Sequence, residues 1–148
     1  MDRHPDCIVK RDDDAVLWIE QQTALLRDRR FEELDITNLI EELDSMARAA
    51  RRELRSRLKG IMLHLLTCEY QPARKSRSWL RSLSTQRQEL ESLFGESPSL
   101  RGLAADHAAQ QYRHAVRDAA LDTGLAQDTF PESCPYTLAQ LLDLDFVS

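Results

Sequence analysis

The chain has 148 residues, of which 30% are charged and 42% hydrophobic, and its formal net charge is −5. A chain of this length fits one domain and can bury a core without the help of a disulfide or a metal. Its three cysteines are far apart and form no Cys-x-x-Cys pair, which argues against a zinc site and suits a reducing compartment. No apolar run approaches the roughly 18 residues that span a bilayer, and the first residues lack the organisation of a signal peptide. We therefore expect a soluble cytoplasmic protein of a single domain, residues 1–148, without a cofactor, a metal or a membrane segment.

The first expected helix spans about Asp13 to Arg29. Three consecutive aspartates, residues 12–14, stand at its start, and arginines are clustered at its end. Negative charge at the beginning of a helix and positive charge at its end both favour the helix dipole. Its apolar positions include Val16, Trp18 and Leu25.

The dominant feature of the sequence is an unbroken amphipathic stretch from Ile36 to Tyr70, which Asp35 can cap and Pro72 ends. Its apolar residues recur at steps of three and four, which is typical of an α-helix. These residues are Ile36, Leu39, Ile40, Leu43, Met46, Ala47, Ala50, Leu54, Leu58, Ile61, Met62, Leu65 and Leu66. The helix would be roughly 50 Å long, so we expect it to be the central helix on which the others pack. Because small residues occur at positions 45–49, the helix could be either straight or kinked there.

Three further helices follow along the chain. The expected bounds are Ser78 to Gly95, Ser99 to Thr123 and, for a short last helix, Pro135 to about Asp143. Runs of alternating β-branched and aromatic residues, which indicate strands, are missing, and short connections favour antiparallel neighbours. The sequence therefore predicts an all-α fold: an up-down bundle of four main helices with a long central helix and a short C-terminal helix.

Charge is segregated along the chain. Residues 48–87 carry eleven Lys/Arg and two Asp/Glu, whereas the rest carries nine basic and twenty-three acidic residues. The basic residues of the long helix form one stripe: Arg48, Arg51, Arg52, Arg55 and Lys59. Such a stripe suits a phosphate backbone. The alternative, which the overall acidity favours, is that the acidic first and fourth helices pack beside the stripe and neutralise it.

His64 lies at the edge of the apolar face of the long helix. The positions three and four residues away hold neither a carboxylate nor another histidine, and the chain contains no Glu-x-x-His. The motif of bundles that bind metal through carboxylates is therefore missing. A histidine hydrogen-bonded to a neighbouring helix is the favoured interpretation.

A polar strip is expected on one face of the fourth helix. Its members are His107, Gln111, His114 and Asp118. Polar groups that face the inside of a bundle need partners, so the strip is a buried network, a solvent-facing strip or, less favoured, a ligand or metal site. The two histidines are two turns apart and cannot chelate one ion without residues from other helices.

Glu41 and Glu42 on the long helix could meet Gln86 and Arg87 of the third helix across the bundle. Carboxylates can serve as general bases, and an arginine can clamp an anionic substrate. Because no nucleophile, metal motif or glycine-rich loop accompanies these residues, a salt bridge between helices is the simpler interpretation.

Short motifs in a fixed order resemble one bacterial family over nearly the whole chain. They are Trp18, Asp35-x-x-Asn-Leu-Ile-Glu-Glu-Leu43, His64-Leu-Leu, Tyr70-Gln-Pro72, Ser78-Trp79, Gln86-Arg87, Ser97-Pro-Ser-Leu100 and Phe130-Pro-x-x-Cys-Pro-Tyr-Thr-Leu138. The family is the domain of unknown function twenty-nine family of cyanobacteria and proteobacteria, whose members are small, single-domain and all-helical. The resemblance implies a fold but no reaction. It also marks a candidate polar cluster: Glu41, Glu42, His64, Gln71, Gln86 and Arg87.

The leading functional hypothesis is a non-enzymatic helical module that binds a protein partner or forms a homo-oligomer. It is motivated by the complementary charged segments and by the lack of a catalytic grouping. One alternative is nucleic-acid binding through the basic segment from Arg48 to Arg87. The other is an enzyme or metal site around Glu41, Glu42, His64 and Arg87.

Overall fold

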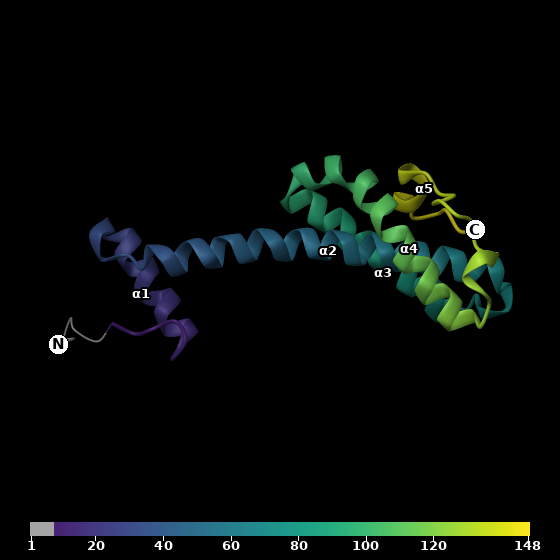
Figure 1. Ribbon diagram of the computed structural model, residues 1–148. Coiled ribbons are helices and arrows are strands. Elements are labelled where there is room, and N and C mark those ends of the chain that lie inside the picture. Colours follow the sequence, from purple (N-terminus) through teal and green to yellow (C-terminus); the bar gives the residue numbers. More distant parts are fainter. Residues whose placement is uncertain (1–7) are drawn as a thin grey trace. The chain divides into compact units, whose positions relative to one another are not determined.

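A computed structural model describes residues 8–148, and every regular element in this range is helical (Figure 1). The α-helices are α1 (Ala15–Arg27), α2 (Ile36–Tyr70), α3 (Arg77–Glu96), α4 (Ala104–Thr123) and α5 (Leu138–Leu142). Short 3-10 helices occupy Phe31–Glu33, Pro72–Arg74, Pro98–Leu103 and Gln127–Thr129. The prediction of an all-α helical bundle with four main helices and a short C-terminal one is confirmed. Cys7 lies outside the described residues.

Capping side chains set the beginnings of α1 and α3. The carboxylate of Asp14 accepts the backbone N–H of Leu17 at 3.0 Å, so α1 begins two residues later than predicted. The hydroxyl of Ser76 accepts the N–H of Trp79 at 3.2 Å, so α3 begins one residue earlier than predicted. An N-cap side chain replaces a missing intrahelical partner of the first turn. The 35 residues of α2 have the predicted bounds, and helical structure continues through residues 45–49.

The last two helices differ from the prediction at their beginnings. The segment Pro98–Leu103, expected to be α-helical from Ser99 on, is a 3-10 helix, and α4 begins only at Ala104. The last helix is shorter than predicted because Thr137 starts it: its hydroxyl accepts the N–H of Gln140, whose side chain accepts the N–H of Thr137 in return. This reciprocal capping box fixes the first turn.

The described helices fall into two compact units, and each is treated by itself. Of the described residues, 8–47 belong to the N-terminal unit and 48–148 to the C-terminal unit. Helix α2 contributes its first turns to the N-terminal unit and the rest of its length to the C-terminal unit. The single domain expected from chain length stays a prediction. No helix within residues 8–148 has the length and apolar character that crossing a membrane requires.

The C-terminal unit contains a well-packed apolar core. Six residues of α2 with helical spacing are completely buried: Leu54, Leu58, Ile61, Met62, Leu65 and Leu66. They pack with Leu83, Leu90 and Phe94 of α3 and with small side chains of α4, and Leu141 of α5 completes the cluster. This part of the predicted apolar stripe therefore forms the core that we expected.

The N-terminal unit has a much smaller interior. Trp18 of α1 is 1% exposed, and its indole N–H donates to Asp35 at 3.0 Å, just before α2. The carboxylate of Asp35 also accepts the side-chain amide of Asn38 at 2.7 Å, while the backbone N–H of Asp35 donates to Gln22 at 2.8 Å. The hydrogen bonds from Asn38 and Trp18 hold the pKa of Asp35 below its ordinary value. A folded-state pKa below the unfolded value stabilises the fold above the ordinary pKa, and this contribution is lost on acidification.

The first turns of α2 correct one expectation. Ile36, Ile40, Leu43 and Met46 belong to the predicted apolar stripe, yet they are between 52% and 66% exposed. The prediction that this part of the stripe is covered by other helices is therefore wrong. Periodicity identifies the apolar face of a helix, but it does not show that another element covers that face.

Candidate functional site

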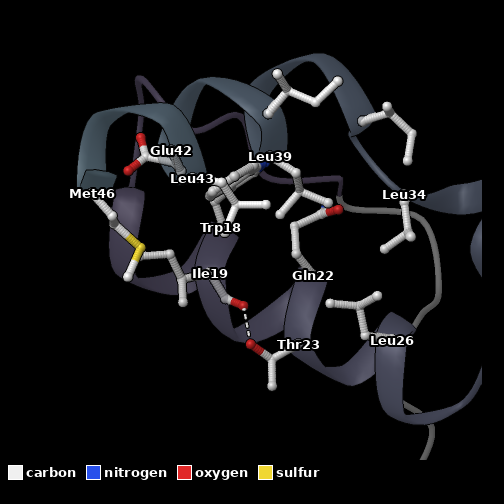
Figure 2. Close-up of a pocket in the computed structure, with 12 residues that line it drawn as sticks. Trp18, Ile19, Gln22, Thr23, Leu26, Leu34, Leu39, Glu42, Leu43 and Met46 are labelled. Atoms are coloured by element: carbon white, nitrogen blue, oxygen red, sulfur yellow. Dashed lines mark hydrogen bonds between the residues drawn. The ribbon is translucent and has the colours of Figure 1, made fainter. Parts of the chain in front are cut away.

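The N-terminal unit carries a groove between α1 and the first turns of α2 (Figure 2). Its volume is about 460 Å³. The groove is lined by Trp18, Ile19, Gln22, Thr23 and Leu26 from α1, by Leu34 just before α2, and by Ile36, Leu39, Ile40, Glu42, Leu43 and Met46 from α2. Nine of these twelve lining side chains are hydrophobic, so the groove is best suited to bind an apolar ligand or an apolar surface.

Six apolar side chains of the groove are open to solvent, and we call them the groove apolar residues. They are Ile19, Leu26, Ile36, Ile40, Leu43 and Met46, and their exposed fractions lie between 47% and 66%. Ten of the thirteen large hydrophobic side chains that are exposed within residues 8–148 lie in the N-terminal unit. Exposed apolar surface is therefore concentrated around this groove, and such patches are typical of binding sites.

The polar side chains of the groove already have partners within the N-terminal unit. Gln22 accepts the N–H of Asp35, and the hydroxyl of Thr23 donates to the carbonyl of Ile19 at 2.8 Å (Figure 2). Glu42 pairs with Arg11 at 3.3 Å. A ligand therefore does not need to supply a charge or a hydrogen bond to these side chains.

Glu41 and Glu42, both members of the candidate polar cluster, share one cation. The guanidinium of Arg11 lies 2.7 Å from Glu41 and 3.3 Å from Glu42. The hydrogen bond to Glu41, followed by the two carboxylate charges, raises the pKa of Arg11. Sequence reasoning did not single out Arg11, because it stands in an irregular segment and lies 30 residues from Glu41.

His64 contacts both its own helix and α3. Its Nδ1 lies 2.6 Å from the carbonyl of Gly60, and its ring centroid lies 4.4 Å from that of Trp79. The indole N–H of Trp79 donates to the backbone carbonyl of His64 at 3.4 Å. The neighbouring helix that we expected is present, but it contacts the ring by aromatic packing and not by a hydrogen bond to the ring nitrogen.

Gln71 and Gln86 join helices of the C-terminal unit. The amide of Gln71 donates to the carbonyl of Thr123 at 2.8 Å, at the end of α4. The side-chain oxygen of Gln86 accepts from Arg57 of α2 at 3.1 Å. Both contacts satisfy polar groups between helices, which is a structural role.

Arg87 is the member of the cluster with the most buried side chain, at 1% exposure. Its guanidinium donates to three backbone carbonyls near the C-terminus: Leu141 at 2.9 Å, Phe146 at 2.7 Å and Gln140 at 3.0 Å. Burial lowers the pKa of Arg87, and the charge of Asp143 opposes this effect. Arg87 thus holds the C-terminal segment, and the six residues of the candidate polar cluster have several separate sets of partners.

The basic stripe is neutralised at one end. The ammonium group of Lys59 pairs with Asp118 of α4 at 3.0 Å. Within residues 8–148 the other four arginines, Arg48, Arg51, Arg52 and Arg55, make no ion pair, and the first three are exposed. Acidic α4 therefore meets the stripe as the alternative interpretation expects, but it reaches only Lys59.

The polar strip of α4 shows no internal network within the described residues. His114 is exposed, Asp118 pairs with Lys59, and His107 and Gln111 are half-buried. The Nδ1 atom of His107 is buried and has no hydrogen-bond partner among residues 8–148. No group of three or more His, Cys, Asp or Glu side chains in residues 8–148 is arranged to hold a metal ion.

A second groove of about 490 Å³ lies beside Tyr112 of α4 and Phe130. The phenol of Tyr112, which is 3% exposed, donates to the carbonyl of Pro131 at 2.7 Å. Burial raises the pKa of Tyr112 from the ordinary 10.0 to about 12. The phenol therefore closes one side of this groove in its neutral form.

Tyr112 should make stability fall steeply in alkali. A folded-state pKa above the unfolded value stabilises the fold at every pH below about 10, and this contribution is lost between about pH 10 and pH 12. The loss amounts to roughly 3 kcal/mol over this whole range, and about half of it falls below pH 11. We expect Tyr112→Phe to cost about 1 kcal/mol at pH 7 through the lost hydrogen bond and to flatten the alkaline loss. Urea unfolding of both proteins from pH 7 to pH 11 measures this, and parallel pH curves would contradict it.

The groove of the N-terminal unit has one sequence signal that could have revealed it. Residues 16–19 are four consecutive apolar residues, so they project from every side of α1. A helix that is apolar on more than one face has to bury more than one face. Trp18 occupies the covered face, whereas Val16 and Ile19 are exposed.

Comparison with known proteins gives one match. No curated protein and no solved structure is similar to the chain. The family model described as "Domain of unknown function DUF29" matches residues 11–147. This range contains both α1, with its groove, and the whole core of the C-terminal unit. Because the match extends over nearly the entire sequence, the chain belongs to this uncharacterised family.

Proposed function

We propose that the protein is a non-enzymatic helical interaction module, which binds another protein chain through the groove of the N-terminal unit. The observation that carries the proposal is the concentration of exposed apolar side chains along that groove. Monomeric proteins rarely expose contiguous apolar patches larger than a few hundred Å² unless the patch binds something. The polar groups of the groove, which already have partners, favour an apolar surface as the ligand.

The form of the groove supports a protein helix over a small molecule. Sites for small molecules are concave and cover most of the ligand, whereas the groove apolar residues are about half exposed. Ile36, Ile40 and Leu43 follow one another at steps of four and three along α2. Side chains with this spacing form the ridges between which a second helix packs.

Site-specific photo-crosslinking tests the proposal. A photoreactive amino acid at Thr23, which lines the groove, should give a discrete protein adduct in cells that express the full chain. The same probe at Thr85, an exposed position of α3, is the matched control and should give none. Leu43→Glu should remove the adduct at Thr23, because the charge would have to be buried against the partner. A Thr23 probe that captures no protein, or captures it equally with Leu43→Glu, would refute the proposal.

A second candidate function rests on the free arginines of the basic stripe. Because Arg48, Arg51 and Arg52 are exposed and form no ion pair with any residue in the range 8–148, they are available to phosphate groups. Binding of nucleic acid by this stripe should weaken steeply with salt, with a slope of about −0.9 per phosphate contacted on duplex DNA. The double variant Arg51→Ala, Arg52→Ala should reduce that slope. The matched control is Arg113→Ala, Arg117→Ala, which removes two exposed arginines of α4, and equal loss in both would contradict a specific role.

A further inference from the structure

We infer that the occupant of the groove is a second copy of this chain, so that two N-terminal units pair in a homodimer. This inference rests on the proposed function and names its partner. The N-terminal unit has a small interior, because within residues 8–47 the buried side chains are Trp18 and Gln22. A segment of about 40 residues seldom folds on so little buried surface without a staple or oligomerisation. If a partner is needed to complete this interior, the partner has to be present whenever the chain is folded. A second copy of the same chain meets this requirement, because it is made together with the first.

The exposed apolar surface has the size that a stable dimer needs. Each groove apolar residue is between 47% and 66% exposed and so presents on the order of 100 Å². The six together present roughly 600 Å². A standard interface takes about 800 Å² from each partner, and somewhat more than half of it is apolar. The groove thus supplies the apolar part of one side of a complete interface.

The groove is also compatible with itself. A two-fold axis brings the same patch of both subunits together, so any unpaired charge in the patch would be buried against its own copy. Among the described residues, the one charged side chain that lines the groove is Glu42, and it pairs with Arg11 of the same unit at 3.3 Å. Gln22 and Thr23 are hydrogen-bonded within the unit. Two copies can therefore meet without leaving a buried charge or donor unpaired.

The direction of the helices fits a symmetric bundle. Figure 2 shows Ile19 and Met46 toward one end of the groove and Leu26 and Leu34 toward the other. Later positions of α1 therefore lie beside earlier positions of α2, and the two helices run antiparallel. Two such hairpins that face each other make a four-helix bundle, whose helices cross at about 20° with interdigitating side chains.

Sedimentation velocity of the full chain over a range of concentrations tests the inference. The wild-type chain should sediment as a dimer, whereas Leu43→Glu and, separately, Ile40→Glu should dissociate on the order of 100 times more readily. Leu121→Glu is the matched control: Leu121 is a leucine of α4 with 75% exposure, and its replacement should leave the dimer intact. Circular dichroism should show that each variant keeps the helices of the C-terminal unit, whose core lies outside the groove.

Crosslinking of the purified protein tests for the homodimer without a substitution in the groove that could destabilise the chain. For this experiment, ¹⁴N-labelled and ¹⁵N-labelled chains, both with the photoreactive residue at Thr23, are mixed in equal amounts. We expect crosslinked peptide pairs in which one groove peptide carries ¹⁴N and the other carries ¹⁵N. Adducts of a single isotope that lead to residues 48–148 would show that the chain covers its own groove, and would overturn the inference. A wild-type monomer at every concentration, or a dimer that persists in both groove variants, would overturn it as well.

The outcomes separate the inference from the proposed function. A monomeric chain whose Thr23 probe captures a different protein in cells, in a manner sensitive to Leu43→Glu, refutes the homodimer and leaves the interaction module standing. A monomeric chain whose Thr23 probe captures no protein at all refutes both.

Discussion

Replacement of Trp18 by alanine should unfold the N-terminal unit while the C-terminal unit stays folded. Trp18 is the one large side chain buried in residues 8–47, and truncation of a buried aromatic residue to alanine costs about 3–5 kcal/mol. The variant also removes the indole donor from Asp35, which adds about 1 kcal/mol or more. Within residues 8–47 the only other buried side chain is Gln22, so little buried surface remains to offset this loss.

Hydrogen exchange with mass spectrometry resolves this effect along the chain. Amides of α1 and of the first turns of α2 should lose protection in Trp18→Ala, and amides of α4 should keep theirs, because local opening follows local stability. Trp18→Phe retains part of the apolar contact but loses the hydrogen bond to Asp35 and some buried volume, so its effect should be intermediate. Unchanged protection of α1 in Trp18→Ala would contradict the small interior described above.

Trp79 provides the matched control on the C-terminal side. It is half-buried and contacts His64, so Trp79→Ala should lower protection around α3 and leave α1 as it is in the wild type. If both tryptophan variants instead unfold the whole chain together, the N-terminal unit is not an independent cooperative unit.

Local sequence patterns were sufficient to predict the helices. Apolar spacing and Pro72 predicted the bounds of α2, because both act within a few residues of the chain. The beginnings of α1 and α5 shifted by a few residues where a capping side chain, Asp14 or Thr137, determined the first turn. These differences concern the geometry of single turns, which composition does not record.

The candidate site could not be predicted in the same way, because exposure depends on distant residues. Leu43 and Leu58 occupy equivalent positions in the apolar stripe of α2, yet Leu43 is 64% exposed and Leu58 is completely buried. The periodicity of α2 is the same at both places, and only the presence or absence of packed neighbours distinguishes them. The periodicity of α2 alone therefore does not reveal the groove.

The polar contacts were equally hard to foresee. Arg87 was expected to pair with a carboxylate, but it binds backbone carbonyls that lie 53 to 59 residues away. Every residue except proline presents the same carbonyl and N–H groups to a partner, so no side-chain motif marks these acceptors. The same holds for Gln71, whose acceptor is the carbonyl of Thr123.

Arg87→Ala should destabilise the C-terminal unit by about 3–5 kcal/mol. The change removes three hydrogen bonds and leaves without their donor the carbonyl of Leu141, in a buried place, and the carbonyls of Phe146 and Gln140, in partly buried places. Each carbonyl left unpaired costs about 1–3 kcal/mol when water cannot reach it. Part of this cost is recovered because the charged guanidinium no longer has to be desolvated.

The loss should be concentrated in the C-terminal segment. Phe146 and Val147 pack against the core, and the hydroxyl of Ser148 donates to the carbonyl of Leu65 at 2.6 Å. When Arg87 no longer holds the segment, these contacts have to retain it alone. We therefore expect proteases to cleave the segment after Thr137 faster in Arg87→Ala than in the wild type, before the rest of the chain unfolds.

Two further variants separate the effect of the hydrogen bonds that Arg87 donates from the effect of its side-chain volume and from the effect of removing any arginine. Arg87→Met fills most of the volume without supplying a donor, so it should recover the packing but not the hydrogen bonds. Arg81→Ala removes an exposed arginine from the same helix and should change stability by less than about 0.5 kcal/mol. Urea unfolding provides the free energies. If Arg87→Met is as stable as the wild type, packing by the side chain, and not its three hydrogen bonds, holds the C-terminal segment in place.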